Sequence, residues 1–252
     1  MIWMDIINRF NLLNSLRTIP IGIPSLMVSF LETITPFGER RTIELSSGNI
    51  ILIWTIVILV VGILLGRIYF ALTASAVKGS EQPFDSNQIL EKTTQGFFLT
   101  LILVSGIVFL ALPISLLLSI LMLVLPSLGT FPFLLVGMLS VWVLLPLAFS
   151  PHGIFSGELK AARSIVTSIR LVRSLMSPTG IFFILLILLG YGLDILWATP
   201  EADNWMLFIG IIGHAFISSG LLAASFIYYE KGVKWLNNSL QPKKQEKPAA
   251  VS

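Results

Sequence analysis

Four ionisable side chains fall inside apolar runs of the sequence: Glu32, Arg67, Asp194 and His214. A charged group in the hydrocarbon region of a membrane costs about 3 kcal/mol or more, so such residues are candidates for binding or proton transfer. His214 lies deepest, and its neighbours Gly213 and Ser218 are small enough to let helices pack closely. Two interpretations follow for His214. It either contacts a substrate or proton, or is a neutral imidazole hydrogen-bonded to a neighbouring helix.

The other three lie nearer the ends of their apolar runs. Glu32 is either a proton or cation site or a carboxylate at the outer headgroups, where Arg40 and Arg41 could pair with it. Asp194 allows the same choice between an intramembrane polar site and a residue at the membrane surface. We expect Arg67 to extend toward the inner lipid phosphates, because its aliphatic stem can remain in apolar surroundings.

The segment from Gly157 to Met176 is helical in pattern but too charged to cross a bilayer. Steps of three and four residues place its polar side chains on one stripe of a helix. This polar stripe contains Lys160, Arg163, Thr167, Arg170 and Ser174, with Arg173 near its edge. A second stripe is apolar and contains Ala162, Ile165, Val166, Ile169, Val172 and Met176. The pattern predicts a helix lying in the membrane interface, with Lys160, Arg163, Arg170 and Arg173 contacting anionic lipid or a partner protein.

The sequence gives little support for enzymatic or metal-binding chemistry. The chain has no Cys and two His residues, so thiolate chemistry is excluded and the usual zinc sites cannot form. Neither phosphate-binding glycine motifs nor a nucleophile elbow occur, and His152 of SPHGIFSG is expected in a loop. We therefore predict a non-enzymatic protein without cofactor or metal. The net charge of +3 comes from short segments next to apolar runs, which is not typical of nucleic-acid binding.

Composition defines the elements that must position these residues. Hydrophobic residues make up 55% of the 252 residues and charged ones 12%, about half the share of a soluble domain, which predicts a polytopic membrane protein. The six expected spans are Thr18–Phe37, Asn49–Phe70, Phe97–Leu125, Phe131–Phe149, Thr179–Ala198 and Asn204–Tyr229. The first contains Pro20 and Pro24 and either crosses fully or forms a re-entrant hairpin. Pro113 is expected to kink the third.

Amphipathic segments that start near residues 3, 84 and 157 each precede a pair of spans. The predicted fold is therefore all-α, with six transmembrane helices arranged as three hairpins, each preceded by an interfacial helix. Residues 1–236 form one membrane domain, and residues 237–252 are expected to be a disordered cytoplasmic tail. With both termini cytoplasmic, all 16 Lys and Arg residues except Arg40 and Arg41 lie inside, as the positive-inside rule requires.

Three segments carry a resemblance to a known family. They are KGSEQPFDSNQILEKTTQGFF, SIRLVRSLMSPTGIFFILLIL and FIYYEKGVKW. Their pattern resembles the membrane domain of bacterial membrane-anchored glycerophosphodiester phosphodiesterases and related free-standing integral-membrane proteins. The resemblance implies a prokaryotic cell-membrane protein. The catalytic domain of those phosphodiesterases is absent from this sequence, so the resemblance implies neither their activity nor their site residues.

These patterns favour a non-enzymatic membrane protein that organises lipid or a membrane-protein complex. Its expected partners are anionic lipids of the inner leaflet and a protein partner or second copy of the chain. One alternative is a small transporter or channel with a polar site around His214. Another is an accessory subunit of a larger membrane complex.

Overall fold

The structure is a computed structural model that describes residues 47–79, 86–128, 130–157, 159–197, 199–201 and 204–240. It also describes Leu12, Ile43, Leu45 and two short strands, Ile34–Thr35 and Gly38–Glu39. The expected helix over residues 3–16, most of Thr18–Phe37, Glu32 and residues 241–252 lie outside the described residues. Asp194 lies in a described helix, but its side chain is outside the described part of the chain.

The described chain is helical apart from one antiparallel pairing, in which β1 (Ile34–Thr35) lies beside β2 (Gly38–Glu39). The long helices are α2 (Gly48–Lys78), α3 (Ser86–Val124), α7 (Met176–Trp197) and α8 (Met206–Leu240). The shorter elements are η3 (Pro126–Leu128), α4 (Phe131–Leu144), η4 (Leu145–Leu147), α5 (Ser150–Phe155) and α6 (Ala161–Ser174).

Five segments of the described chain are long and apolar enough to cross a membrane. They are Gly48–Lys78, Leu90–Val124, Phe131–Phe155, Met176–Trp197 and Met206–Ser239. An α-helix needs about 20 apolar residues for this purpose, and each segment exceeds that length. The described chain therefore agrees with the expected all-α class, and five of the six expected spans correspond to these candidate membrane-crossing segments. Near the end of the first expected span, Ile34 and Thr35 form a strand, so a helix does not include these two residues.

Two helix boundaries differ from the expectation. No separate helix precedes the third span, because α3 begins at Ser86 and continues without interruption to Val124. Its polar first turns are continuous with the span, and Pro113 lies inside the helix without ending it. At the other end of the chain, α8 continues to Leu240, past the expected end of the span at Tyr229 and the expected domain boundary at residue 236.

The region around His152 also differs. We expected a span to Phe149 followed by a loop, but α4 ends at Leu144 and α5 begins at Ser150. Pro146 lies between them in η4, and Pro151 lies in the first turn of α5. Proline cannot donate a backbone hydrogen bond, so it interrupts a helix but fits a first turn well. His152 is consequently helical, and its assignment to a loop was wrong.

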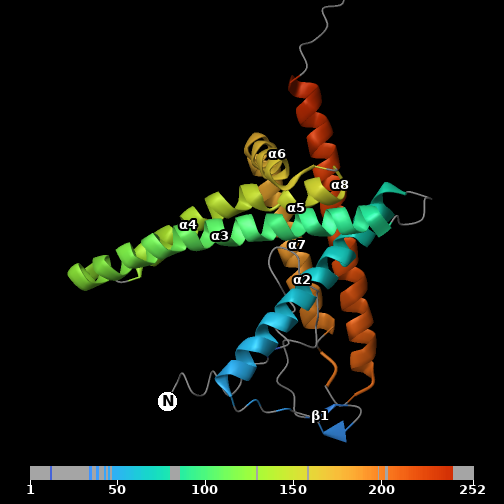
Figure 1. The fold of residues 1–252 in the computed structure, drawn as a ribbon, viewed down its shortest axis with the longest axis horizontal. Coiled ribbons are helices and arrows are strands. Elements are labelled where there is room, and N and C mark those ends of the chain that lie inside the picture. Colours follow the sequence, from blue (N-terminus) through green and yellow to red (C-terminus); the bar gives the residue numbers. More distant parts are fainter. Residues whose placement is uncertain are drawn as a thin grey trace, which may run out of the picture.

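The helices fall into two regions (Figure 1). Helices α7 and α8 lie side by side, and α2 also contacts α8. Helix α3 and, beyond η3, helix α4 run across this direction and extend away from it in Figure 1. Short helices α5 and α6 contact each other and lie where the two sets meet.

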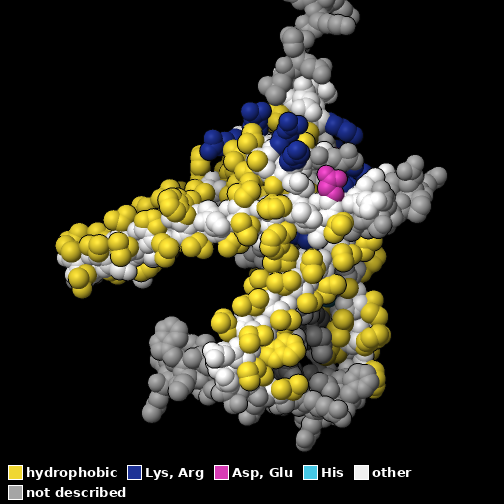
Figure 2. All heavy atoms as spheres, viewed as in Figure 1, with side chains coloured by type: hydrophobic (Ala, Val, Ile, Leu, Met, Phe, Trp, Pro, Cys, Tyr) yellow, Lys and Arg dark blue, Asp and Glu magenta, His cyan; other side chains and the backbone are white. Residues whose placement is uncertain are grey.

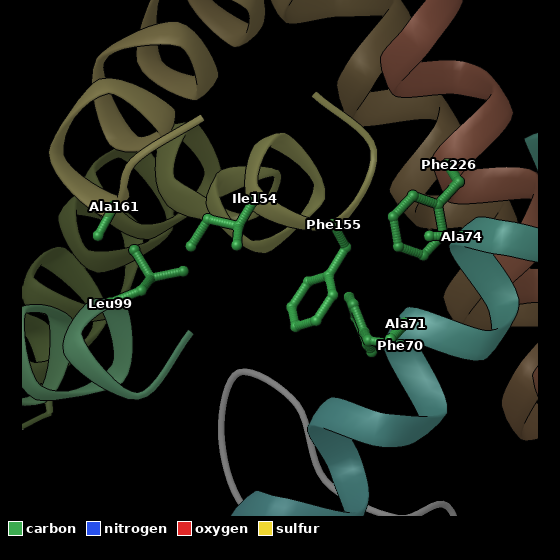
Figure 3. Packing of buried hydrophobic residues seen from close by; sticks show 8 residues of the cluster. All are labelled: Phe70, Ala71, Ala74, Leu99, Ile154, Phe155, Ala161 and Phe226. Atoms are coloured by element: carbon green, nitrogen blue, oxygen red, sulfur yellow. The ribbon is translucent and has the colours of Figure 1, made fainter. Parts of the chain in front are cut away.

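Buried side chains concentrate where α2, α3, α5, α6 and α8 come together, a region we call the junction. Its larger cluster comprises Phe70, Ala71, Ala74, Leu99, Ile154, Phe155, Ala161 and Phe226. Figure 3 shows these side chains directed toward one another from five helices. A second cluster adds Phe149, Leu171, Val172 and Tyr229. In contrast, residues 101–144, which we call the arm, have Pro132 as the one buried residue among those described.

Candidate functional site

Helix α6 carries three of the four basic residues that the sequence singled out, and the fourth, Lys160, directly precedes its first residue. Lys160, Arg163, Arg170 and Arg173 are all exposed. The opposite face of the helix is buried in the junction and consists of Ala161, Ser164, Ser168, Leu171 and Val172. The predicted basic face is therefore present on the outside of the molecule.

The apolar stripe of α6 does not behave as one unit. Val172 is buried against protein, whereas Val166 on the same expected stripe is 46% exposed. Val172 therefore faces the junction, whereas Val166 shares the exposed side of the helix with Arg163 and Arg170, three and four residues away. The assignment of the whole stripe to the membrane was wrong, because the pattern of hydrophobic residues cannot distinguish contact with protein from contact with lipid.

Two serines attach α6 to the break between α4 and α5. Ser168 Oγ donates to the carbonyl of Pro146 at 2.7 Å and accepts from the backbone N–H of Phe149 at 3.1 Å. Ser164 Oγ donates to the carbonyl of Ser150. Backbone groups at a helix interruption need partners when buried, and these hydroxyls supply them. The orientation of α6, and so of its basic face, is set by these contacts.

The basic side chains collect at one end of the molecule. In Figure 2 the Lys and Arg atoms gather around α6 and the adjoining part of α8, whereas hydrophobic atoms cover the arm and most of the remaining described surface in this view. Lys231 and Lys234 of α8 are exposed as well. This separation of charge from apolar surface is the distribution expected of a membrane protein with one basic side.

His214, the deepest of the expected intramembrane polar residues, is buried, unlike the exposed basic residues at α6. His214 is 5% exposed in α8, which places it inside the protein. A Cβ on Gly213 would lie 2.8 Å from the ring of Trp197 of α7, so the glycine permits close packing of these helices. Because Glu32 and the side chain of Asp194 lie outside the described residues, their candidate roles as polar sites within the membrane stay predictions.

A different histidine, His152, forms a buried polar contact in the junction. Its Nε2 atom lies 2.7 Å from Ser225 Oγ of α8. Ser225 Oγ donates its single hydrogen to the carbonyl of Leu222 at 2.7 Å. The Ser225 oxygen must therefore accept from His152, which assigns the imidazole proton to Nε2. This contact joins α5 to α8.

Aromatic rings surround this pair. The ring centre of His152 lies 4.5 Å from that of Phe226, 5.1 Å from Phe149, 5.7 Å from Phe70 and 5.9 Å from Tyr229. In nucleophilic catalysis a serine donates its proton to the histidine, but here the serine proton goes to a backbone carbonyl. We interpret the pair as a structural link between helices.

Arg67 is enclosed by protein. It is 1% exposed in α2, so its guanidinium does not reach the outer surface of the protein, where it was expected to meet lipid phosphates. Its Nη2 group donates to Thr100 Oγ1 of α3, whereas Nε and Nη1 have no hydrogen-bond partner among the described residues. Gly96 of α3 makes room for it, because a Cβ at this position would lie 2.9 Å from Arg67 Cδ.

The sequence contained partial signals for these contacts. Ser164 and Ser168 lie one turn apart within a basic helix, and prolines bracket the segment before His152. The partners of these residues lie on other helices, so spacing along the chain could not identify them. Within the described residues, no group of three or more His, Asp or Glu side chains is arranged to hold a metal ion.

Comparison of the chain with protein-family models, with curated proteins and with solved structures finds no match.

Proposed function

We propose that this protein is a non-enzymatic, multi-pass membrane protein that binds anionic lipid headgroups through the outward face of α6. The observation that supports the proposal most directly is the exposure of Lys160, Arg163, Arg170 and Arg173 on a helix whose opposite face is held by the junction. Within Ala161–Ser174 there is no acidic residue to neutralise this face.

An exposed apolar side chain on α6 supports contact with lipid. Val166 lies three residues after Arg163 and four before Arg170, so it shares their exposed side, and its methyl groups would meet acyl chains where the basic groups meet phosphates. Each Lys or Arg near an anionic surface contributes about 1 kcal/mol. Four of them would strengthen binding to an anionic surface roughly a thousandfold at low salt.

The same proposal includes the topology. Six spans in three hairpins, with both termini cytoplasmic, place α6 and the exposed lysines of α8 at the inner leaflet. This leaflet carries the anionic lipids, and the basic end in Figure 2 is consistent with it.

The test compares the wild-type chain with a variant in which Lys160, Arg163, Arg170 and Arg173 are all changed to Gln. In nanodiscs, we expect the wild type to enrich phosphatidylglycerol over phosphatidylcholine and the variant to lose that enrichment. A matched control changes the three arginines to Lys, which retains the charge. Unchanged enrichment in the Gln variant would reject the proposal, and so would loss of a protein partner with lipid enrichment intact.

The transporter alternative around His214 gains less support. The indole of Trp197 fills the space over Gly213, directly before His214, and this packing favours a structural role for the histidine. His214→Ala should therefore affect stability before it affects any flux measured in proteoliposomes.

A further inference from the structure

Arg67 is a buried cation that the proposed function leaves unused. It lies in α2 and donates one hydrogen bond, from Nη2 to Thr100 Oγ1. Thr100 Oγ1 donates its own hydrogen to the carbonyl of Gly96 at 3.1 Å, so the threonine is held in place as an acceptor. The guanidinium thus has a fixed partner on one nitrogen only.

The remaining donors of Arg67 define what could bind there. Nε and Nη1 are buried and have no partner among the described residues. An unpaired buried charge costs several kcal/mol, and the cost falls when an anion with oxygen acceptors occupies the free donors. Arginine suits carboxylates and phosphates because its planar group presents several N–H bonds in a rigid arrangement.

Nearby described carboxylates do not fill this role. Glu91, on the same helix as Thr100, is exposed, and nine residues of α-helix separate them by about 13 Å. Neither Glu201 nor Glu230 forms an ion pair or hydrogen bond with Arg67 in the described chain. An anion at these donors would therefore come from outside the described residues.

The depth of Arg67 points to the headgroup region. Gln95, adjacent to Gly96, accepts a hydrogen bond from the N–H of Ala161, the first residue of α6, at 3.3 Å. Lys92, one turn earlier, donates to the carbonyl of Phe155 at 3.3 Å. Arg67 therefore lies close to the level of α6, where the exposed basic residues are, and not midway along the span.

We propose that Arg67, oriented by Thr100 and accommodated beside Gly96, forms a binding site through its Nε and Nη1 groups for an oxyanion, carried by a lipid headgroup or present as free phosphate. This site is separate from the outward face of α6 and does not require that face to bind lipid. Because it is buried, salt should weaken it far less than it weakens the exposed face.

The test measures the unfolding temperature of the purified full chain by tryptophan fluorescence at high salt. The probes are short-chain phosphatidylglycerol, inorganic phosphate and dioctanoylglycerol as the neutral control. We expect phosphatidylglycerol to raise the wild-type unfolding temperature and dioctanoylglycerol to leave it unchanged. An equal response to inorganic phosphate would support the site and identify a free anion as its source.

Two variants make the test specific. Arg67→Met removes the buried charge, so it should be as stable as the wild type or more stable without ligand, yet lose the response. Thr100→Val keeps the shape but removes the acceptor that orients the guanidinium, so half-saturation should need about tenfold more phosphatidylglycerol. It also serves as the test if Arg67→Met fails to fold.

The test distinguishes failure of the Arg67 site from failure of the proposed lipid binding by α6. The fourfold Gln variant of α6 should retain the response at high salt, since its charges are screened there. The inference is overturned if Arg67→Met and Thr100→Val respond like the wild type. It is also overturned if Glu32→Gln changes unliganded stability as Arg67→Met does and no anion shifts the wild type, because Arg67 would then be paired within the chain.

Discussion

The junction and the arm differ in what surrounds their apolar side chains. At the junction, the ring of Phe70 lies 5.5 Å from that of Phe226 and 5.7 Å from that of Phe155, and Ser168 and His152 find polar partners outside their own helices. In the arm, Phe109 is 79% exposed and Leu123 84% exposed. Hydroxyl groups there bond to their own helix, as Ser119 does to the carbonyl of Ser115 at 2.8 Å.

This contrast shows two ways in which a helical protein can satisfy its backbone hydrogen bonds and accommodate its apolar side chains. In the arm, the backbone is satisfied within each helix and apolar side chains can face lipid, which needs no specific partner. At the junction, short helices interrupted by proline need hydrogen bonds from side chains and close packing from neighbours. Substitutions at equivalent residue types should therefore have unequal effects in the two regions.

The largest difference should follow from removing an aromatic ring. Phe226→Ala should lower the free energy of unfolding by about 3–5 kcal/mol, because Phe226 is fully buried and its removal leaves a cavity. Phe109→Ala, in the arm, should change it by less than about 1 kcal/mol. Unfolding of both variants by sodium dodecyl sulfate in mixed micelles measures the pair, and equal losses would contradict the distinction.

Serine substitutions should give a smaller difference in the free energy of unfolding between the two regions. Ser168→Ala leaves the carbonyl of Pro146 and the N–H of Phe149 without their partner, so we expect a loss of about 2–3 kcal/mol. Ser119→Ala removes only a bond within its own helix and should be nearly neutral, since such bonds add little to helix stability. The same titration measures both; a loss at Ser119 as large as at Ser168 would show that the arm is packed against something.

Glycine substitutions should give the smallest effects and opposite signs. A Cβ at Gly153 would lie 2.8 Å from the hydroxyl of Tyr229 and would also meet Ser164, so Gly153→Ala should destabilise by about 1–2 kcal/mol. Gly106 of the arm has no atom within 4 Å of that position, so Gly106→Ala should stabilise by roughly 0.5–1 kcal/mol through helix propensity. Thermal unfolding of the two variants checks the signs, and destabilisation by both would refute the comparison.

Several features of the fold could be predicted because they depend on neighbouring residues. Apolar runs identified five described spans, and spacing along α6 identified its exposed basic face. The segment around His152 was expected to be a loop, and its short helix was not predicted. The expected break between the amphipathic segment near residue 84 and the span from Phe97 was wrong, because polar residues can continue a helix that begins outside the apolar region.

The same distinction, between properties of neighbouring residues and contacts between distant helices, applies to the candidate sites. Composition, periodicity and charge distribution by themselves determined that the chain is mostly helical, with helices long and apolar enough to cross a membrane and one strongly basic helix, since these properties are local. Only the tertiary structure decided that Arg67 and His152 are buried, that serines hold α6, and that part of its apolar stripe faces protein. Burial and hydrogen bonding of these residues depend on helices distant in the sequence, such as Thr100 for Arg67 and Ser225 for His152. No spacing within a single helix records such partners.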